Sequence, residues 1–306
     1  MPPLTRFFVN RTSEIDKLNA ALHSKGAEKD SFVLIYGQQG IGKTQLLARY
    51  LRECNDRNVR IAYVDLESMV TKGYLGLIDA IVEGLGSDGF EELDKTYDDI
   101  LFRFDFEQSQ SLAAQAQDQL RAGERAASGS SPGMVFDGPL NADEMIFING
   151  QVDFKDTRIN YIFNFDQAEP AQVAELHQRR ITRVFADCLR KMTTEQLVII
   201  LLDHWDKAGD PIQTWLNDSL LEWATDLILK RALIVVSRDA LPPKFEDQMG
   251  VVPLAIPPFS REIALEFWKR HGLAEEEFPA IGAEIYGMPG ILSLEVGKWR
   301  VKKKVK

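Results

Sequence analysis

The segment SFVLIYGQQGIGKT, residues 31–44, decides how the chain folds. Its first part, Ser31–Tyr36, is an apolar run rich in β-forming residues that leads into glycines, which predicts a buried strand. Residues 37–44 match the pattern G-x-x-x-x-G-K-[ST] at every defined position. Lys43–Cys54 then repeats apolar residues at helical spacing. Because the pattern lies between a predicted strand and a predicted helix, we interpret it as a phosphate-binding loop (P-loop).

The residue types of this loop suit a nucleotide phosphate. Glycines let backbone N–H groups curl around a β-phosphate, and a helix that begins near Gly42 directs the positive end of its dipole at that anion. We expect Lys43 to neutralise β- and γ-phosphate oxygens and the Thr44 hydroxyl to ligate Mg²⁺. The expected binding residues of the loop are Gly37, Gln38, Gln39, Gly40, Ile41, Gly42, Lys43, Thr44 and Gln45.

Strands and helices alternate along much of the remaining chain. Apolar runs predict strands over Val59–Asp65, Leu197–Asp203 and Ala232–Ser237, and helical spacing predicts helices over Tyr74–Leu85 and Pro211–Lys230. Continuous apolar strands that alternate with helices are typical of a parallel sheet covered on both faces. The predicted fold is therefore α/β, a three-layer P-loop NTPase with a parallel sheet.

Polar residues follow two of these strands. Asp203 closes the strand LVIILLD and is expected to hold Mg²⁺, while Asp206 either orients an attacking water or caps the following loop. Arg238 follows the next strand, where it either contacts a γ-phosphate or pairs with a surface carboxylate. His204 stands directly after Asp203, where many efficient hydrolases of this superclass carry Glu. We therefore expect slow turnover.

The alternation breaks between residues 105 and 178. Gln108–Pro132 is rich in Ala, Gln, Gly and Ser, which is typical of a linker or surface loop. The Asn149-Gly150 pair predicts a hairpin over Met145–Phe154, and alternating apolar residues predict a third strand over Arg158–Phe165. We expect a small β insertion over about residues 105–165.

Composition limits the partners. Lys+Arg 36 against Asp+Glu 46 gives a net charge of −10, which opposes broad electrostatic capture of nucleic acid; the basic stretch Lys298–Lys306 is the exception. Cys54 and Cys188 lack the spacing of a disulfide framework or zinc site, as expected for a reducing, cytoplasmic setting. The longest apolar run, Leu197–Leu202, is too short to span a bilayer, so no membrane role is expected.

Together these motifs resemble those of the STAND class of signal-transduction ATPases, relatives of the AAA+ proteins. Phe8–Arg11, followed by Ser13–Leu18, resembles the N-terminal motif of that class, although Asn10 stands where Gly is usual. The resemblance implies that Val9 and Arg11 line the adenine side. The P-loop resembles the Walker A motif without departure, Asp203–Asp206 resembles Walker B, and Ser237-Arg238 resembles the sensor strand.

A further likeness lies near the C-terminus. Tyr286–Gly290, after the predicted helix Arg261–His271, resembles the GxP signature of a small helical lid, although Gly-x-Pro-Gly is also ordinary turn chemistry. The resemblance implies that Pro289 packs near the adenine. It also implies two domains, an NTPase domain over residues 1–256 and a C-terminal α-helical lid over residues 257–306.

The resemblance implies a regulatory switch that binds ATP or ADP with Mg²⁺ and is closed with ADP. With ATP it would open and self-associate as a homo-oligomer, and hydrolysis would reset it. The implied catalytic residues are Lys43, Asp203, Asp206 and Arg238, and sensor or effector domains are expected on partner chains or in a longer form of the protein. The alternatives are an AAA+ ATPase acting on DNA, as a loader or transposition-type protein, and a P-loop kinase for a small molecule.

Overall fold

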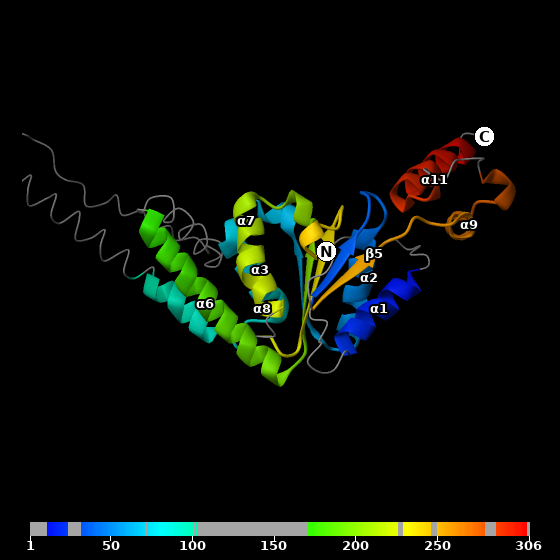
Figure 1. Ribbon diagram of the computed structural model, residues 1–306. Coiled ribbons are helices and arrows are strands. Elements are labelled where there is room, and N and C mark those ends of the chain that lie inside the picture. The colour runs from blue at the N-terminus through cyan, green and yellow to red at the C-terminus, as the bar shows by residue number, and fades with distance from the viewer. Residues whose placement is uncertain are drawn as a thin grey trace, which may run out of the picture. The chain divides into compact units, whose positions relative to one another are not determined.

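The computed structural model of the chain (Figure 1) describes residues 11–23, 32–70, 72–100, 102, 171–225, 229–245, 250–278 and 286–304. The predicted β insertion, with its hairpin and third strand, lies outside these residues, as does Val9. The chain divides into two compact units, residues 1–90 with 185–306, and residues 91–184. The sheet, the P-loop and the C-terminal helices belong to the first unit.

Within the described residues, the sheet has five parallel strands in the order β2-β3-β4-β1-β5, which confirms the predicted α/β fold. β3 is buried along its whole length and β4 is buried up to Ser237. Such continuous burial is expected for parallel strands covered on both faces. The strands are β1 Phe32–Tyr36, β2 Arg60–Asp65, β3 Val198–Asp203, β4 Ala232–Arg238 and β5 Val251–Ala255.

β5 is the strand that the sequence pattern did not predict. It pairs with β1 at the edge of the sheet, is mostly exposed or half-buried, and contains Pro253. An edge strand needs no continuous apolar run and tolerates proline, so it lacks the signal by which the other strands are recognised.

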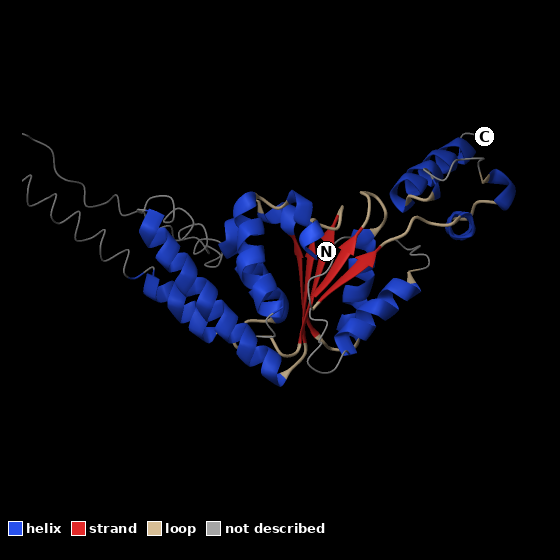
Figure 2. Ribbon diagram, viewed as in Figure 1, coloured by secondary structure: helices blue, strands red, loops and turns tan. Residues whose placement is uncertain are grey.

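Helices cover both faces of the sheet (Figure 2). On one face, Leu18 of α1 and Leu46 and Tyr50 of α2 pack with Val33 and Ile35 of β1 in one apolar core. Figure 1 shows α3, α7 and α8 on the other face. The helices are α1 Thr12–His23, α2 Lys43–Asp56, α3 Gly73–Leu85, α6 Ala171–Glu195, α7 Asp210–Trp215, α8 Glu222–Thr225, α9 Arg261–Arg270 and α11 Pro289–Lys304.

The predicted helix Pro211–Lys230 is divided in the structure. α7 continues through a π-helical turn, Leu216–Leu221, into α8. Short 3₁₀ turns follow β2 at Leu66–Met69 and β3 at Trp205–Lys207, and two more occur at Pro243–Phe245 and Glu275–Glu277. In the second unit, residues 91–100 are helical, and Asp99 forms an ion pair with Arg180 of α6 at 2.8 Å.

The C-terminal helices α9 and α11, called the lid below, have an apolar core of their own. Phe259, Phe267 and Trp268 pack there with Leu292 and Val296 of α11. Ser260 caps α9, because its Oγ accepts the N–H of Ile263 at 3.4 Å. Over the described residues, no helix combines the length and apolar character needed to cross a membrane.

Candidate functional site

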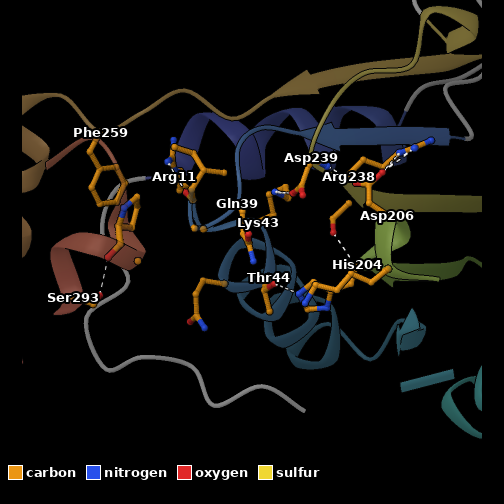
Figure 3. Close-up of a pocket in the computed structure, with 18 of the residues that line it drawn as sticks. Arg11, Gln39, Lys43, Thr44, His204, Asp206, Arg238, Asp239, Phe259 and Ser293 are labelled. Carbon is orange, nitrogen blue, oxygen red and sulfur yellow. Dashed lines mark hydrogen bonds and ion pairs between the residues drawn. The ribbon is translucent and has the colours of Figure 1, made fainter. Parts of the chain in front are cut away.

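A cavity of about 340 Å³ lies beside the P-loop, within the first unit (Figure 3). Its walls come from the P-loop, the turns after β3 and β4, and the lid. Gly37, Gln38 and Asp203 are not among its lining residues. The predicted site residues that line it are Arg11, Gln39, Gly40, Ile41, Gly42, Lys43, Thr44, Gln45, Asp206, Arg238 and Pro289.

The P-loop backbone depends on glycine at two positions that face the lid. Gly40 has φ +83° and Gly42, directly before α2, has φ +101°, angles that side-chain-bearing residues rarely adopt. A Cβ at Gly40 would lie 3.7 Å from Met288 Cε, and one at Gly42 would lie 3.9 Å from Pro289 Cγ. Glycine is therefore required at both positions by the backbone angle, because a Cβ would make only ordinary van der Waals contact with the lid.

Lys43 is the cation at the centre of the loop. Its Nζ donates to the carbonyl oxygens of Gly37 at 2.6 Å and Gln38 at 3.2 Å, and pairs with Asp239 Oδ1 at 2.8 Å. The Lys43 side chain is 10% exposed, whereas that of Asp239 is 57% exposed. Asp239 is thus the anion that neutralises Lys43 here, and a nucleotide phosphate would compete with it for the same ammonium group.

This competition predicts that Asp239→Asn tightens nucleotide binding. Replacing the carboxylate by an amide removes the charge that competes for Lys43, and an ion pair whose carboxylate is largely exposed is worth about 0.5–1 kcal/mol, or roughly 2- to 5-fold in affinity. Titration with a fluorescent ADP analogue measures the change. Asp218→Asn, at an exposed position outside the cavity lining, removes the same charge and should leave the dissociation constant unchanged. Equal or weaker binding by Asp239→Asn would contradict the competition.

Asp203 is fully buried at the end of β3 and accepts three hydrogen bonds. Its donors are the Tyr63 hydroxyl at 3.1 Å, the His204 N–H at 3.0 Å and the Ser237 hydroxyl. Burial, and then the Asp203 charge, raise the pKa of Tyr63, which keeps that hydroxyl protonated as a donor. The three donors provide a buried carboxylate with the partners that it needs.

Asp206 and Arg238 form an ion pair at the ends of neighbouring strands. Arg238 donates through Nε at 3.1 Å and Nη2 at 2.8 Å to Asp206 Oδ1, and its guanidinium lies 5.6 Å from the ring centroid of Trp205. Asp206 Oδ2 accepts the N–H of Asp239 at 2.5 Å. The sequence left open whether Arg238 contacts a γ-phosphate or pairs with a carboxylate, and in this structure it pairs with Asp206. The roles of Asp206 toward water and of Arg238 toward a γ-phosphate stay predictions.

His204 lies between the P-loop and the end of β2. Its Nδ1 is 2.9 Å from Asp65 Oδ1, and its Nε2 is 3.4 Å from Thr44 Oγ1 (Figure 3 marks the latter contact). His204 has φ +57°, which is uncommon for a residue with a side chain. The residue noted in the sequence as a departure after Asp203 thus contacts the predicted Mg²⁺ ligand Thr44.

The lid contacts the P-loop directly. The N–H of Gly290, in the first turn of α11, donates to the Gly40 carbonyl at 3.0 Å. Arg11 provides a second link, because its Nη2 donates to Ile41 O at 3.2 Å while its guanidinium lies 4.9 Å from the centroid of the Phe259 ring. One cavity is therefore shared by the loop and the lid.

The donor groups of the site fit a nucleotide with Mg²⁺. The cavity presents a buried ammonium at Lys43, and the glycines leave the loop free of Cβ atoms toward the lid. Oxygen ligands, which Mg²⁺ prefers, are present in the lining as the Thr44 hydroxyl and the Asp206 carboxylate, which is paired with Arg238 in this structure; Asp203 is buried outside the lining.

A match to a family model over most of the chain shows the family to which it belongs. Residues 8–227 match the family model described as "AAA ATPase domain". The chain belongs to this family. Membership of this family implies nucleotide binding, usually with Mg²⁺, and the P-loop is the candidate nucleotide site. No curated protein matches the chain.

Three solved structures illustrate the proteins to which the chain is similar, each at under 20% sequence identity. A STAND protein with a tetratricopeptide repeat sensor from Pyrococcus horikoshii is 17% identical over 96% of this chain and 30% of its own, with a TM-score of 0.44. Cdc6p from Pyrobaculum aerophilum is 12% identical over 87% and 50%, with a TM-score of 0.42. Drosophila ORC bound to DNA is 12% identical over 94% and 53%, with a TM-score of 0.38. The chain spans well under two thirds of each, and these likenesses do not decide among their functions.

Several lining residues were not predicted as site residues. Asp239, Phe259, Phe267, Gly290 and Ser293 line the cavity alongside the predicted set. Asp239 directly follows the predicted Ser237-Arg238 sensor, and Gly290 belongs to the quoted lid motif, so proximity to a motif was the available signal. The two phenylalanines carried no such signal: Phe267 lies at helical spacing in α9, where an aromatic residue is most simply explained as core, and Phe259 lies in the segment before that helix.

Proposed function

We propose that this AAA ATPase is a nucleotide-dependent switch in which ADP favours the lid docked on the P-loop, and ATP favours an open, self-associating form. The single observation that carries the proposal is the Gly290 N–H···O=C Gly40 hydrogen bond, 3.0 Å long, between lid and loop. Because both sides of this contact line the nucleotide cavity, occupancy of the cavity and docking of the lid are coupled.

The coupling free energy must come from a difference in affinity of the two nucleotides for the two states, typically about 1–3 kcal/mol. A γ-phosphate adds charge at Lys43, where Asp239 is already paired, and near Arg238, which is held by Asp206. We propose that these pairs rearrange when ATP binds. Mg²⁺, when bound, would supply charge neutralisation at the phosphates, with Thr44 and Asp203 as its proposed protein partners.

Gly290→Ala is predicted to weaken the docked state. A Cβ at this position would lie 3.2 Å from the Gly40 oxygen and 3.3 Å from its Cα, so the backbone of α11 must move away from the loop. Losing one such hydrogen bond costs about 1 kcal/mol, or roughly 5-fold in ADP affinity. Stopped-flow release of a fluorescent ADP analogue should be faster by a similar factor.

Gly297→Ala is the matched control for that substitution. Gly297 lies in the same helix, and a Cβ built there meets nothing within 4 Å beyond its own turn of the helix. Both substitutions place a better helix former in α11, a gain of about 1 kcal/mol at the interior position 297, so the control shows how much of the effect comes from helix stability. Equal ADP release by the two variants would show that the contact does not hold the nucleotide.

The switch itself is tested by the solution mass. With Mg²⁺ and ADP, light scattering should give the mass of a single species. With a non-hydrolysable ATP analogue, it should give the larger mass of a defined oligomer. The same mass with both nucleotides would overturn the self-association part of the proposal. Salt-sensitive binding of duplex DNA would instead favour the alternative of an ATPase acting on DNA, because phosphate contacts weaken steeply as salt rises.

A further inference from the structure

The carboxylate that follows β3 does not contact the hydroxyl of Thr44 in this structure. Asp203 is fully buried, is absent from the cavity lining and already accepts from Tyr63, Ser237 and its neighbour His204. Among the described residues, the side-chain contact of Thr44 Oγ1 is with His204 Nε2, at 3.4 Å. The hydroxyl predicted to face the cation is thus positioned by an imidazole.

The backbone brings His204 to this place. Asp65 and Asp203 are register partners at the ends of β2 and β3, so the residue after Asp203 lies beside the Asp65 carboxylate. The left-handed conformation of His204 is uncommon for a non-glycine residue and is held by its N–H, which lies within hydrogen-bond distance of Asp203 Oδ1 at 3.0 Å and Ser237 Oγ at 3.1 Å. Its side chain is 30% exposed and lines the cavity.

Asp65 fixes which nitrogen of the imidazole faces Thr44 as an acceptor. A carboxylate only accepts hydrogen bonds, so the Asp65 contact at 2.9 Å assigns the proton to Nδ1 and leaves Nε2 of the neutral ring as an acceptor. Thr44 can then donate its hydroxyl hydrogen to Nε2, which leaves the lone pairs of Oγ1 for a cation. The Asp65 carboxylate is itself fixed, because Oδ1 also accepts the Glu67 N–H at 3.1 Å.

We propose that Asp65 is a positioning residue that acts through His204 to orient the Thr44 hydroxyl toward the divalent cation of the bound nucleotide. The inference rests on the proposed placement of that cation at Thr44. It extends the site to the end of β2, which no predicted site residue occupies. His204 directly contacts the proposed ligand Thr44, and removing a partner at such a position typically changes metal affinity by about 10- to 100-fold; Asp65 acts through it.

The nearby acidic side chains are paired with other groups in this structure. Ligand atoms of Asp65, Glu67 and His204 lie within 4.8 Å of one another. However, Glu67 is held by the ammonium group of Lys207 at 2.6 Å, and that contact lowers the pKa of the Glu67 carboxyl. With Glu67 paired to a cation and Asp65 paired to His204, the observed contacts favour the positioning role.

Three substitutions separate positioning from local structure. Asp65 caps the turn Leu66–Met69. Asp65→Ser keeps a capping hydroxyl but is too short to reach His204, whereas Asp65→Asn keeps both the cap and an oxygen that accepts from Nδ1. His204→Ala removes the imidazole itself. A double variant, Asp65→Ser with His204→Ala, tests whether the two residues act as a unit.

The measurement is the dissociation constant of a fluorescent ADP analogue with Mg²⁺ and with EDTA. We expect Asp65→Ser and His204→Ala to lose about 10-fold of the Mg²⁺-dependent gain in affinity, with unchanged affinity in EDTA. Asp65→Asn should retain most of the gain, and the double variant should be no worse than either single one.

Other results would overturn the proposal. An unchanged Mg²⁺-dependent gain in Asp65→Ser and His204→Ala, or an equal loss of affinity with and without Mg²⁺, would leave Asp65 with a structural role only. A wild-type chain that binds ADP without any Mg²⁺ effect would remove the cation from Thr44 and the proposal with it. A wild-type chain that fails to bind ADP at all would instead refute the nucleotide site, so the two failures are distinguishable.

Discussion

Lys43→Ala should abolish measurable nucleotide binding while the fold stays intact. Lys43 is the buried cation of the loop, and its ammonium is held at the cavity by two backbone carbonyls and Asp239. Losing its charge-assisted contacts to phosphate costs about 3 kcal/mol, or more than about 100-fold in affinity. Isothermal titration with ADP and ATP measures the binding, and circular dichroism with urea unfolding checks that the fold is retained.

The fold should survive this substitution because the groups that contact Lys43 do not need its ammonium group. Asp239 is mostly exposed, so water can solvate its carboxylate when the lysine is absent. In the contacts described, no other side chain depends on the ammonium group. Lys95→Ala, which removes an exposed lysine paired with Glu92, is the charge-matched control and should bind nucleotide normally. Tight ADP binding by Lys43→Ala would show that the nucleotide sits elsewhere.

Arg11→Met should produce the largest loss of stability. Arg11 is 5% exposed, pairs with Glu14 at 3.2 Å, donates to Ile41 O, and lies against Phe259. Burial lowers the pKa of its guanidinium and Glu14 opposes that shift, as expected for a buried pair. Methionine keeps much of the apolar length but leaves the Glu14 carboxylate buried without its cation, which typically costs about 3–5 kcal/mol. Urea unfolding measures the free energy.

Glu14→Gln in the same chain provides the internal control. If the cost arises from the unpaired carboxylate, the double variant Arg11→Met with Glu14→Gln should regain a large part of the stability lost by Arg11→Met alone. Strictly additive losses would mean that Arg11 stabilises the protein through Phe259 and Ile41 rather than through the ion pair.

The sequence was most informative where local pattern alone sets the structure. β1, the P-loop and α2 were predicted because an apolar run, special glycines and helical spacing are all encoded within residues 31–56. β3 and β4 were predicted because strands buried on both faces must be apolar throughout. β5 was missed, since an edge strand with Pro253 has no such requirement.

Contacts between distant segments could not be predicted in the same way. Asp239 is paired with Lys43 although 196 positions separate them, and no local spacing encodes that pair. In the sequence, Gly290 belongs to a motif that an ordinary turn also explains, and only the structure shows that its N–H donates to the Gly40 carbonyl. His204 was recognised only as a departure from a motif, because its contact with Asp65 depends on the register between β2 and β3.

The order of the strands has a consequence for how the protein is made. β1, which leads into the P-loop, lies between β4 and β5 in the sheet, and both are encoded about 200 residues later. At a translation rate of about 5–20 residues per second, β1 waits roughly 10–40 s on the ribosome before either neighbour has been synthesised. During that interval the N–H and C=O groups along both edges of β1 lack their partner strands, so the strand is open to wrong pairing until late in synthesis.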